Sequence, residues 1–354
     1  MRLVEEVPIG TSLQLSREHN LRNAAANVIQ TSLNAQPGDQ ILLVFDAYGR
    51  EIADAFLDAA RALDQHLTAV YVPVDTQEAT NTLSKWSALV ELIRSSTAIV
   101  TAVTDGHTST AFRVALLDTA VKHKLRAIHM PGVSDEVFLA SALGVDFETL
   151  NANAARVAGS LTAANEAKIY TRSILTGQSH CLSVRLEGRA GHSDGGIAAP
   201  GQIINIPTGE AYIATIENSA EGSLVVNGSF PECDLSTGRE VVLAFANGRL
   251  NVDASAFPED GAGAYCRNLL LSAVSDSASE MSVGELGIGL NQGIRAVEGR
   301  TILDEKVFGT CHIAIGSNAP FGGTNHAPYH LDLVFYPVSV LLDGTGLDIP
   351  WNSR

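Results

Sequence analysis

The first half of the chain alternates short apolar runs with helical patterns, and this alternation constrains the fold more than any other feature. Four runs rich in β-branched residues have the length of strands: Ile41–Phe45, Leu67–Val72, Thr97–Val103 and Arg126–Met130. Between the first two runs, apolar residues recur at helical spacing, at Ile52, Phe56, Ala60 and Leu63. Strands that are apolar throughout suit a parallel sheet with helices on both faces. We therefore predict an α/β domain of the Rossmann or flavodoxin type over residues 1–170.

The second half has a different texture. From about Ser179 the chain reads as alternating strands broken by glycine and asparagine, including GQIINIPTG (Gly201–Gly209) and REVVLAFANG (Arg239–Gly248). Such a pattern is typical of antiparallel sheets. A helical pattern over Gly263–Ala273 interrupts it. A chain of 354 residues also exceeds what one hydrophobic core usually supports. We predict a second domain over residues 171–354, of the α+β class and mainly antiparallel.

Charge and composition restrict the partners. The chain has 23 Lys and Arg against 39 Asp and Glu, which gives a formal net charge of −16. This balance disfavours nucleic acid and anionic membrane surfaces as partners, and favours small or cationic ligands. The N-terminal segment has no apolar core of a secretion signal, and no apolar run approaches the length of a membrane span. The expected location is the cytoplasm.

The cysteines and the turns after the apolar runs exclude some kinds of site. Four cysteines are scattered without paired spacing, so the sequence indicates neither a disulfide framework nor a thiolate zinc site. Since the turns contain no GxGxxG or P-loop, nucleotide binding has little support. His107 and His129 lie near predicted strand ends, where they could touch a substrate. We interpret both as structural histidines and leave them out of the predicted metal site.

Acids and histidines crowd the glycine-rich apolar strands near the C-terminus. They occur in GELGIGLN (Gly284–Asn291), LDEKVFGTCHIAIG (Leu303–Gly316) and HAPYHLDLVF (His326–Phe335). The residues concerned are Glu285, Asp304, Glu305, His312, His326, His330 and Asp332. Burying such groups unpaired costs several kcal/mol, and a bound cation removes that cost. The working hypothesis is a metal site.

Local sequence makes some of these candidates stronger than others. Glu285 is the only charged residue in its segment, and His330 and Asp332 have the period-2 spacing that points both side chains to one face of a strand. Glu210 ends the run NIPTGE at a turn, where a solvated carboxylate is the alternative. Glu305 precedes Lys306, so a surface ion pair is the alternative there.

The kinds of ligand restrict the metal. Imidazoles and carboxylates without a thiolate cluster suit Zn, Co or Mn, with Fe as a further alternative. Two histidines and three or four carboxylates exceed the needs of one zinc ion. Two divalent metal ions that share a carboxylate fit this number of ligands best.

Four motifs in a fixed order resemble a known family. NIPTGE, GELGIG, LDEK with CHIAIG, and HLD resemble the aminopeptidase T-like metallopeptidases, which include the thermophilic-type leucyl aminopeptidases. The resemblance implies a dinuclear metal centre in the C-terminal domain, cytoplasmic homodimers, and removal of N-terminal residues from peptides or small amides with a free amine. It implies Glu305 as the catalytic acid and base or as an additional ligand. The metal ligands that it implies are Glu210, Glu285, His312, His330 and Asp332.

The chain departs from this family in ways that leave alternatives open. The peptidases usually have a tyrosine seven residues after the histidine of the CHIAIG motif, where this chain has Ala319; Tyr329 is a candidate substitute. The chain therefore resembles a divergent member. The same superfamily includes a ring-cleaving dihydroxypyridine dioxygenase with one iron held by two histidines and an aspartate, and a histidine at the position of Glu285. Our prediction is a metal-dependent aminopeptidase; the alternatives are that oxygenase and an inactive metal-binding homologue.

Overall fold

The computed structural model describes residues 9–73, 83, 86–103, 110–273 and 281–351. The chain forms two compact units. The first contains the residues up to 148 together with 196–208, and the second contains 149–195 and 209–354. The predicted domain boundary at residue 170 stays a prediction.

A five-stranded parallel sheet forms the centre of the first unit, in the order β2-β1-β3-β4-β8. The first four strands in the chain match the four predicted runs and confirm the α/β class. The strands are β1 (Gln40–Phe45), β2 (His66–Tyr71), β3 (Ala98–Ala102), β4 (Arg126–His129) and β8 (Ile203–Asn205).

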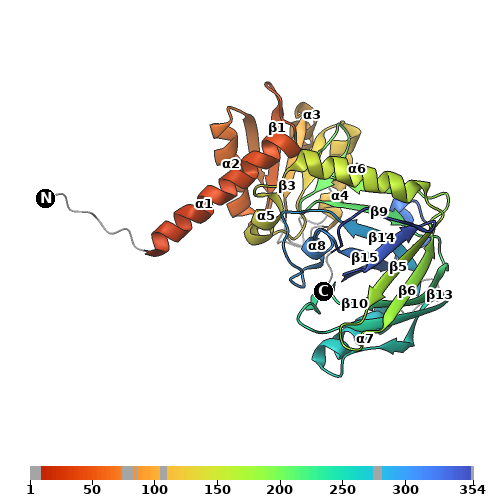
Figure 1. The fold of residues 1–354 in the computed structure, drawn as a ribbon. Helices are drawn as coiled ribbons and strands as arrows, with labels where there is room; N and C mark the ends of the chain where they lie inside the picture. The colour runs from red at the N-terminus through yellow and green to blue at the C-terminus, as the bar shows by residue number, and fades with distance from the viewer. Residues whose placement is uncertain (1–8, 74–82, 84–85, 104–109, 274–280, 352–354) are drawn as a thin grey trace. The chain divides into compact units, whose positions relative to one another are not determined.

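Helices cover the sheet of the first unit (Figure 1). They are α1 (Ile9–Asn27), α2 (Arg50–Ala62), α3 (Ser87–Ser95), α4 (Thr110–Lys122) and α5 (Asp135–Ala142), with a π-helical turn at Val28–Ser32. Leu42 and Val44 of β1 pack in a core with residues of α3 and α4. Ile41 and Leu43 point the other way and are also buried, on the side where α2 contacts β1. No helix in the described part of the chain is long and apolar enough to cross a bilayer.

One sequence prediction about the strands is wrong. The segment GQIINIPTG was interpreted as an antiparallel strand of the second domain, but its strand β8 pairs in parallel with β4, with Ala127 opposite Ile203. A three-residue strand is too short for its apolar pattern to distinguish the two kinds of sheet. After β8, Gly209 adopts a positive φ of 115° and leads the chain into the second unit.

The second unit contains two antiparallel sheets and confirms the α+β class. The six-stranded sheet has the order β13-β10-β6-β5-β17-β18, and the seven-stranded sheet has the order β12-β11-β16-β15-β14-β9-β7. The strands of the first are β5 (Glu166–Arg172), β6 (Ser179–Arg185), β10 (Ala220–Val226), β13 (Val241–Ala256), β17 (Ser339–Leu342) and β18 (Thr345–Gly346). Those of the second are β7 (Gly191–Asp194), β9 (Glu210–Ala214), β11 (Ser229–Phe230), β12 (Cys233–Asp234), β14 (Val283–Gly289), β15 (Cys311–Gly316) and β16 (His330–Phe335).

Helices accompany these sheets. The second unit also contains α7 (Gly261–Ala273), as predicted, and the short helix α8 (Thr301–Asp304). Helix α6 (Phe147–Ala163) begins at the end of the first unit and continues into the second. Its buried side chains include Leu150, Ala154, Val157 and Leu161, which are the residues of its amphipathic pattern.

The central strands of the seven-stranded sheet have two unlike faces, because successive side chains of a strand point in opposite directions. One face carries fully buried apolar side chains, among them Leu286, Ile313 and Leu333. Cys311 also belongs to this apolar face, since it alternates with His312, and its thiol is free and buried. The opposite face carries the acids and histidines. The alternation therefore places the apolar core on one face of these strands and the ionisable side chains on the other.

Candidate metal centre

Strand register brings the predicted ligands onto one face of the sheet. Residues directly opposite each other in antiparallel strands share a face. Gly287 of β14 is opposite His312 of β15. Glu285 of β14 is opposite Ala314 of β15, which is in turn opposite Asp332 of β16. Gly289 is opposite Glu210 of β9. The residues that share this face on four neighbouring strands are Glu210, Glu285, His312, His330 and Asp332.

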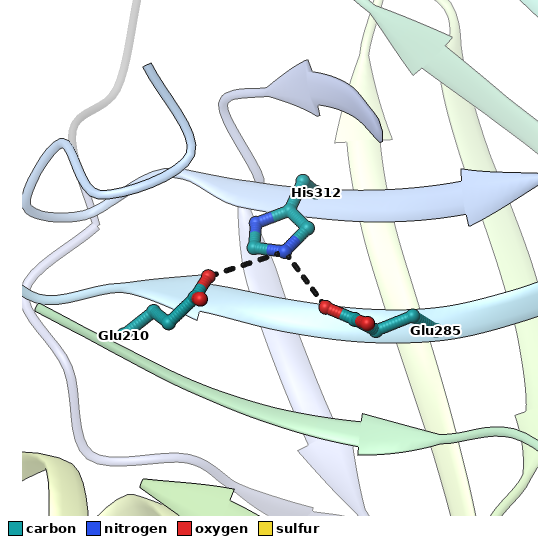
Figure 2. A group of neighbouring side chains, drawn as sticks. All are labelled: Glu210, Glu285 and His312. Atoms are coloured by element: carbon teal, nitrogen blue, oxygen red, sulfur yellow. Dashed lines mark hydrogen bonds and ion pairs between the residues drawn. The ribbon is translucent and has the colours of Figure 1, made fainter. Parts of the chain in front are cut away.

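Their side chains converge on a single cluster. The Nε2 atom of His312 lies 3.2 Å from Glu285 Oε1 and 3.4 Å from Glu210 Oε2 (Figure 2). The Nε2 atom of His330 lies 3.2 Å from Asp332 Oδ1 and 3.6 Å from Glu285 Oε2. Glu285 therefore connects the two imidazoles, and the predicted pairing of His330 with Asp332 on one face is present.

Three overlapping groups of possible metal ligands result. They are Glu210 with Glu285 and His312; Glu285 with His330 and Asp332; and Glu305 with His312 and Asp332. Within each group, one ligand atom per residue lies within 4.8 Å of the others. The structure thus brings together all six residues predicted as ligands or catalytic group, while their roles stay predictions. Asp304 and His326 belong to none of these groups: Asp304 accepts a hydrogen bond from the backbone of Glu298, and His326 is exposed.

Glycine makes room for an imidazole in this cluster. A Cβ atom on Gly287 would lie 2.1 Å from both Cε1 and Nε2 of His312, a separation that real atoms do not allow. The glycine of GELGIG therefore permits the close cross-strand approach that places His312 beside Glu285.

Replacing Gly287 with alanine is expected to displace the His312 imidazole and to weaken Zn²⁺ binding by about 10-fold or more, the size of effect seen when the support of a ligand is removed. Isothermal titration with Zn²⁺ measures the change. Gly159→Ala is a matched control, because a Cβ atom there meets nothing within 4 Å. Wild-type affinity in a folded Gly287→Ala variant would contradict this account.

Two details of the cluster fit a bound cation. The Nδ1–H group of His330 donates to the carbonyl of Ser317 at 2.7 Å, so Nε2 is the nitrogen directed at the carboxylates, where it would bind a metal in place of a proton. Histidines that bind metals commonly have their second nitrogen fixed in this way. Glu210 Oε2 is buried and accepts no hydrogen bond within the described part of the chain. Buried oxygens without a donor are rare, and a cation satisfies them.

Burial and mutual charge shift the proton affinities in the cluster. Burial lowers the pKa of His312, but its hydrogen bond to Glu285 and the charge of Glu210 outweigh this effect and raise the pKa to about 9. Burial raises the pKa of Asp332, but the hydrogen bond from His330 and the charges of His330, His312 and Lys306 together outweigh it and lower the pKa to about 2. The cluster therefore attracts positive charge, which either protons or a metal ion can supply.

Glu305 and Lys306 enter the cluster from a turn. Helix α8 ends at Asp304, and Gly309 adopts a positive φ of 77° before β15 begins. Lys306 Nζ donates to Glu305 Oε1 at 2.7 Å, but Lys306 is only 2% exposed. The alternative of a surface ion pair is therefore wrong. Burial raises the pKa of Glu305 to about 8, despite the nearby ammonium.

Sequence reasoning missed a row of rings beside the cluster. His192 stacks on Tyr212, which contacts Phe321 edge-on, and Phe321 contacts His330 edge-on, with ring centroids 5.2 to 5.5 Å apart. Burial and the charges of Glu210 and Glu285 raise the pKa of Tyr212 far above its usual range. The period-2 spacing of Glu210 and Tyr212 is a signal that could have identified this tyrosine.

His107 and His129 of the first unit were predicted to be structural histidines rather than metal ligands. His129 forms a hydrogen bond with Thr101 through Nδ1 at 2.8 Å, and burial with the nearby Arg113 lowers its pKa to about 4. These contacts agree with a structural role. His107 lies outside the described residues.

Comparison with known proteins supports the fold. No protein-family model and no curated protein matches the chain. The 2,5-dihydroxypyridine dioxygenase from Pseudomonas putida KT2440 matches with a TM-score of 0.69 and 17% identity, over 94% of this chain and 96% of its own. Wild-type AmpT from Thermus thermophilus matches with a TM-score of 0.60 and 14% identity, over 93% of this chain and 99% of its own. The chain has the fold of these two proteins, and the predicted aminopeptidase T-like fold is confirmed.

Proposed function

We propose that this chain is a metal-dependent hydrolase that removes N-terminal residues from peptides. The observation that carries the proposal is the cluster itself: two imidazoles and four carboxylates converge at one face of a sheet whose central strands are apolar on the other face. Such a donor set suits Zn, Co or Mn. The fold shared with AmpT supports an enzyme of the aminopeptidase T type.

The residues of the cluster have separable tasks in this reaction. Glu285, His312, His330 and Asp332 would hold the metal, while Glu210, whose Oε2 lies 3.4 Å from His312 Nε2, adds negative charge beside them. A divalent ion held there supplies an activated water and polarises a carbonyl group. Glu305 lies within reach of His312 and Asp332 and is the group that takes a proton from the attacking water and returns it to the leaving amine.

The charge of the site suits the proposed substrate. Carboxylates outnumber imidazoles in the cluster, so the site attracts the free ammonium group of a peptide N-terminus. The same negative charge would repel a peptide C-terminal carboxylate. A peptide or small amide with a free amine is therefore the substrate class that we propose. We also propose that the protein acts as a cytoplasmic homodimer, as the family resemblance implies.

A second candidate is an oxygenase that cleaves an aromatic ring. The row of rings formed by His192, Tyr212 and Phe321 beside His330 favours it, because such a surface suits a planar substrate. The shared fold with a dihydroxypyridine dioxygenase points the same way. The presence of Glu285 between the two imidazoles favours the hydrolase, since an additional carboxylate is not needed for iron held by two histidines and one carboxylate.

One experiment separates the two candidates. The protein is loaded with Zn²⁺, Co²⁺, Mn²⁺ or Fe²⁺ and incubated without oxygen with a panel of dipeptides and aminoacyl amides. The hydrolase releases free amino acids under these conditions. Oxygen consumption with 2,5-dihydroxypyridine, combined with no release of amino acids from any member of the panel, would overturn the proposal in favour of the oxygenase.

A further inference from the structure

Lys306 places a buried positive charge inside the acidic cluster. Its ammonium group donates to Glu210 Oε1 and to Glu305 Oε1. A lysine is almost never this fully buried unless it is paired, and here it has two carboxylate partners. Lys306 thus takes part in the cluster as a cation.

The backbone on both sides fixes this lysine in place. The N–H group of Lys306 donates to the carbonyl of Leu303, and its own carbonyl accepts from Asn291 at 2.9 Å. Gly209, next to Glu210, approaches Asn291 so closely that a Cβ atom would lie 2.6 Å from the Asn291 Cβ. Three chain segments therefore meet at Lys306 and hold it in the site.

Lys306 pairs with two carboxylates that a second metal ion would need, those of Glu210 and Glu305. Glu210 and Glu305 each belong to a possible ligand group that contains His312, while His330 belongs to the group with Glu285 and Asp332. A divalent ion bound by Glu210 and Glu305 would share both carboxylates with the ammonium. Two like charges at contact distance repel each other strongly in a buried site.

We propose that the Lys306 ammonium takes the place of one of two metal ions, so that the centre binds a single divalent ion through Glu285, His312, His330 and Asp332. Lys306 neutralises Glu210 and positions Glu305 for proton transfer. This inference rests on the proposed function, since it assumes that the cluster binds a catalytic metal. It replaces the expectation of two ions, which rested on the number of ligands alone.

The stoichiometry of metal binding tests the proposal. Chelated protein is titrated with Zn²⁺ alone, and bound metal is counted after dialysis. Wild-type protein is expected to bind one ion per chain. Lys306→Met is expected to bind two, because it releases Glu210 and Glu305 for a second ion while keeping the size of the side chain. In chelator this variant should also melt at a lower temperature than wild type, and excess Zn²⁺ should restore its stability.

Lys168→Met is the matched control, because Lys168 pairs with Glu166 at the surface. It should bind one ion and melt like the wild type. Two ions in the wild-type protein, or one ion in a folded Lys306→Met variant, would overturn the proposal. If Lys306→Met fails to fold, the wild-type count alone decides between one ion and two. Failure of both proteins to bind any ion would instead overturn the proposed function.

Discussion

Replacing His330 with alanine is expected to remove bound metal and activity together. His330 Nε2 lies within reach of both Asp332 and Glu285, and its Nδ1 is held by Ser317. Loss of a ligand should weaken metal binding more than loss of a supporting group, which costs about 10- to 100-fold. The melting temperature in the presence of Zn²⁺ should also fall, because the variant loses the stabilisation that binding supplies. Metal counting and dipeptide hydrolysis measure the two losses.

A histidine outside the cluster provides the control. His326 precedes β16, is exposed and belongs to none of the ligand groups, so His326→Ala should keep wild-type metal content and turnover. Glu285→Ala should behave like His330→Ala, since Glu285 contacts both imidazoles. Normal metal content in both His330→Ala and Glu285→Ala would refute the assignment of these residues as ligands.

Replacing Glu305 with glutamine is expected to lower kcat by about 10²-fold or more while metal content stays at the wild-type level. The amide keeps the size of the side chain and can still accept a hydrogen bond from Lys306, but it cannot take a proton. Steady-state kinetics with a dipeptide substrate and a metal count on the same sample measure both quantities.

The same variant distinguishes three roles for Glu305. Loss of the metal would make Glu305 a ligand, and unchanged turnover with unchanged metal would refute both functional roles. Glu166→Gln is the control: Glu166 is a half-exposed carboxylate that also pairs with a lysine, but it lies on the six-stranded sheet away from the cluster. Its replacement should leave kcat unaltered.

Much of the fold could be predicted from local patterns in the sequence. The four runs of the first half form β1 to β4 because short, apolar, β-branched stretches bounded by turns are typical of buried strands in a parallel sheet. The shared face of His330 and Asp332 follows from the period of a strand. Gly309 permits the bend after α8 because it adopts a positive φ. In each case the deciding interaction lies within a few residues of the chain.

What the sequence could not predict depends on contacts between distant segments. Lys306 looks like a surface residue next to Glu305, and its burial becomes evident only when Glu210, almost a hundred residues earlier, is placed beside it. The row of His192, Tyr212 and Phe321 depends on which strands are neighbours. Strand β8 joins the first sheet through pairing with β4, which its three residues do not encode locally.

The measurement that tests the central claim most directly is metal analysis of the unaltered protein, purified without added ions and dialysed before counting. We predict one equivalent of a divalent transition metal per chain, held by the Glu, His and Asp side chains on the face of β14, β15 and β16. Chelation should remove it and lower the melting temperature. Protein that retains no metal, binds none on titration with Zn²⁺, Co²⁺, Mn²⁺ or Fe²⁺, and melts at the same temperature with and without chelator would contradict the claim.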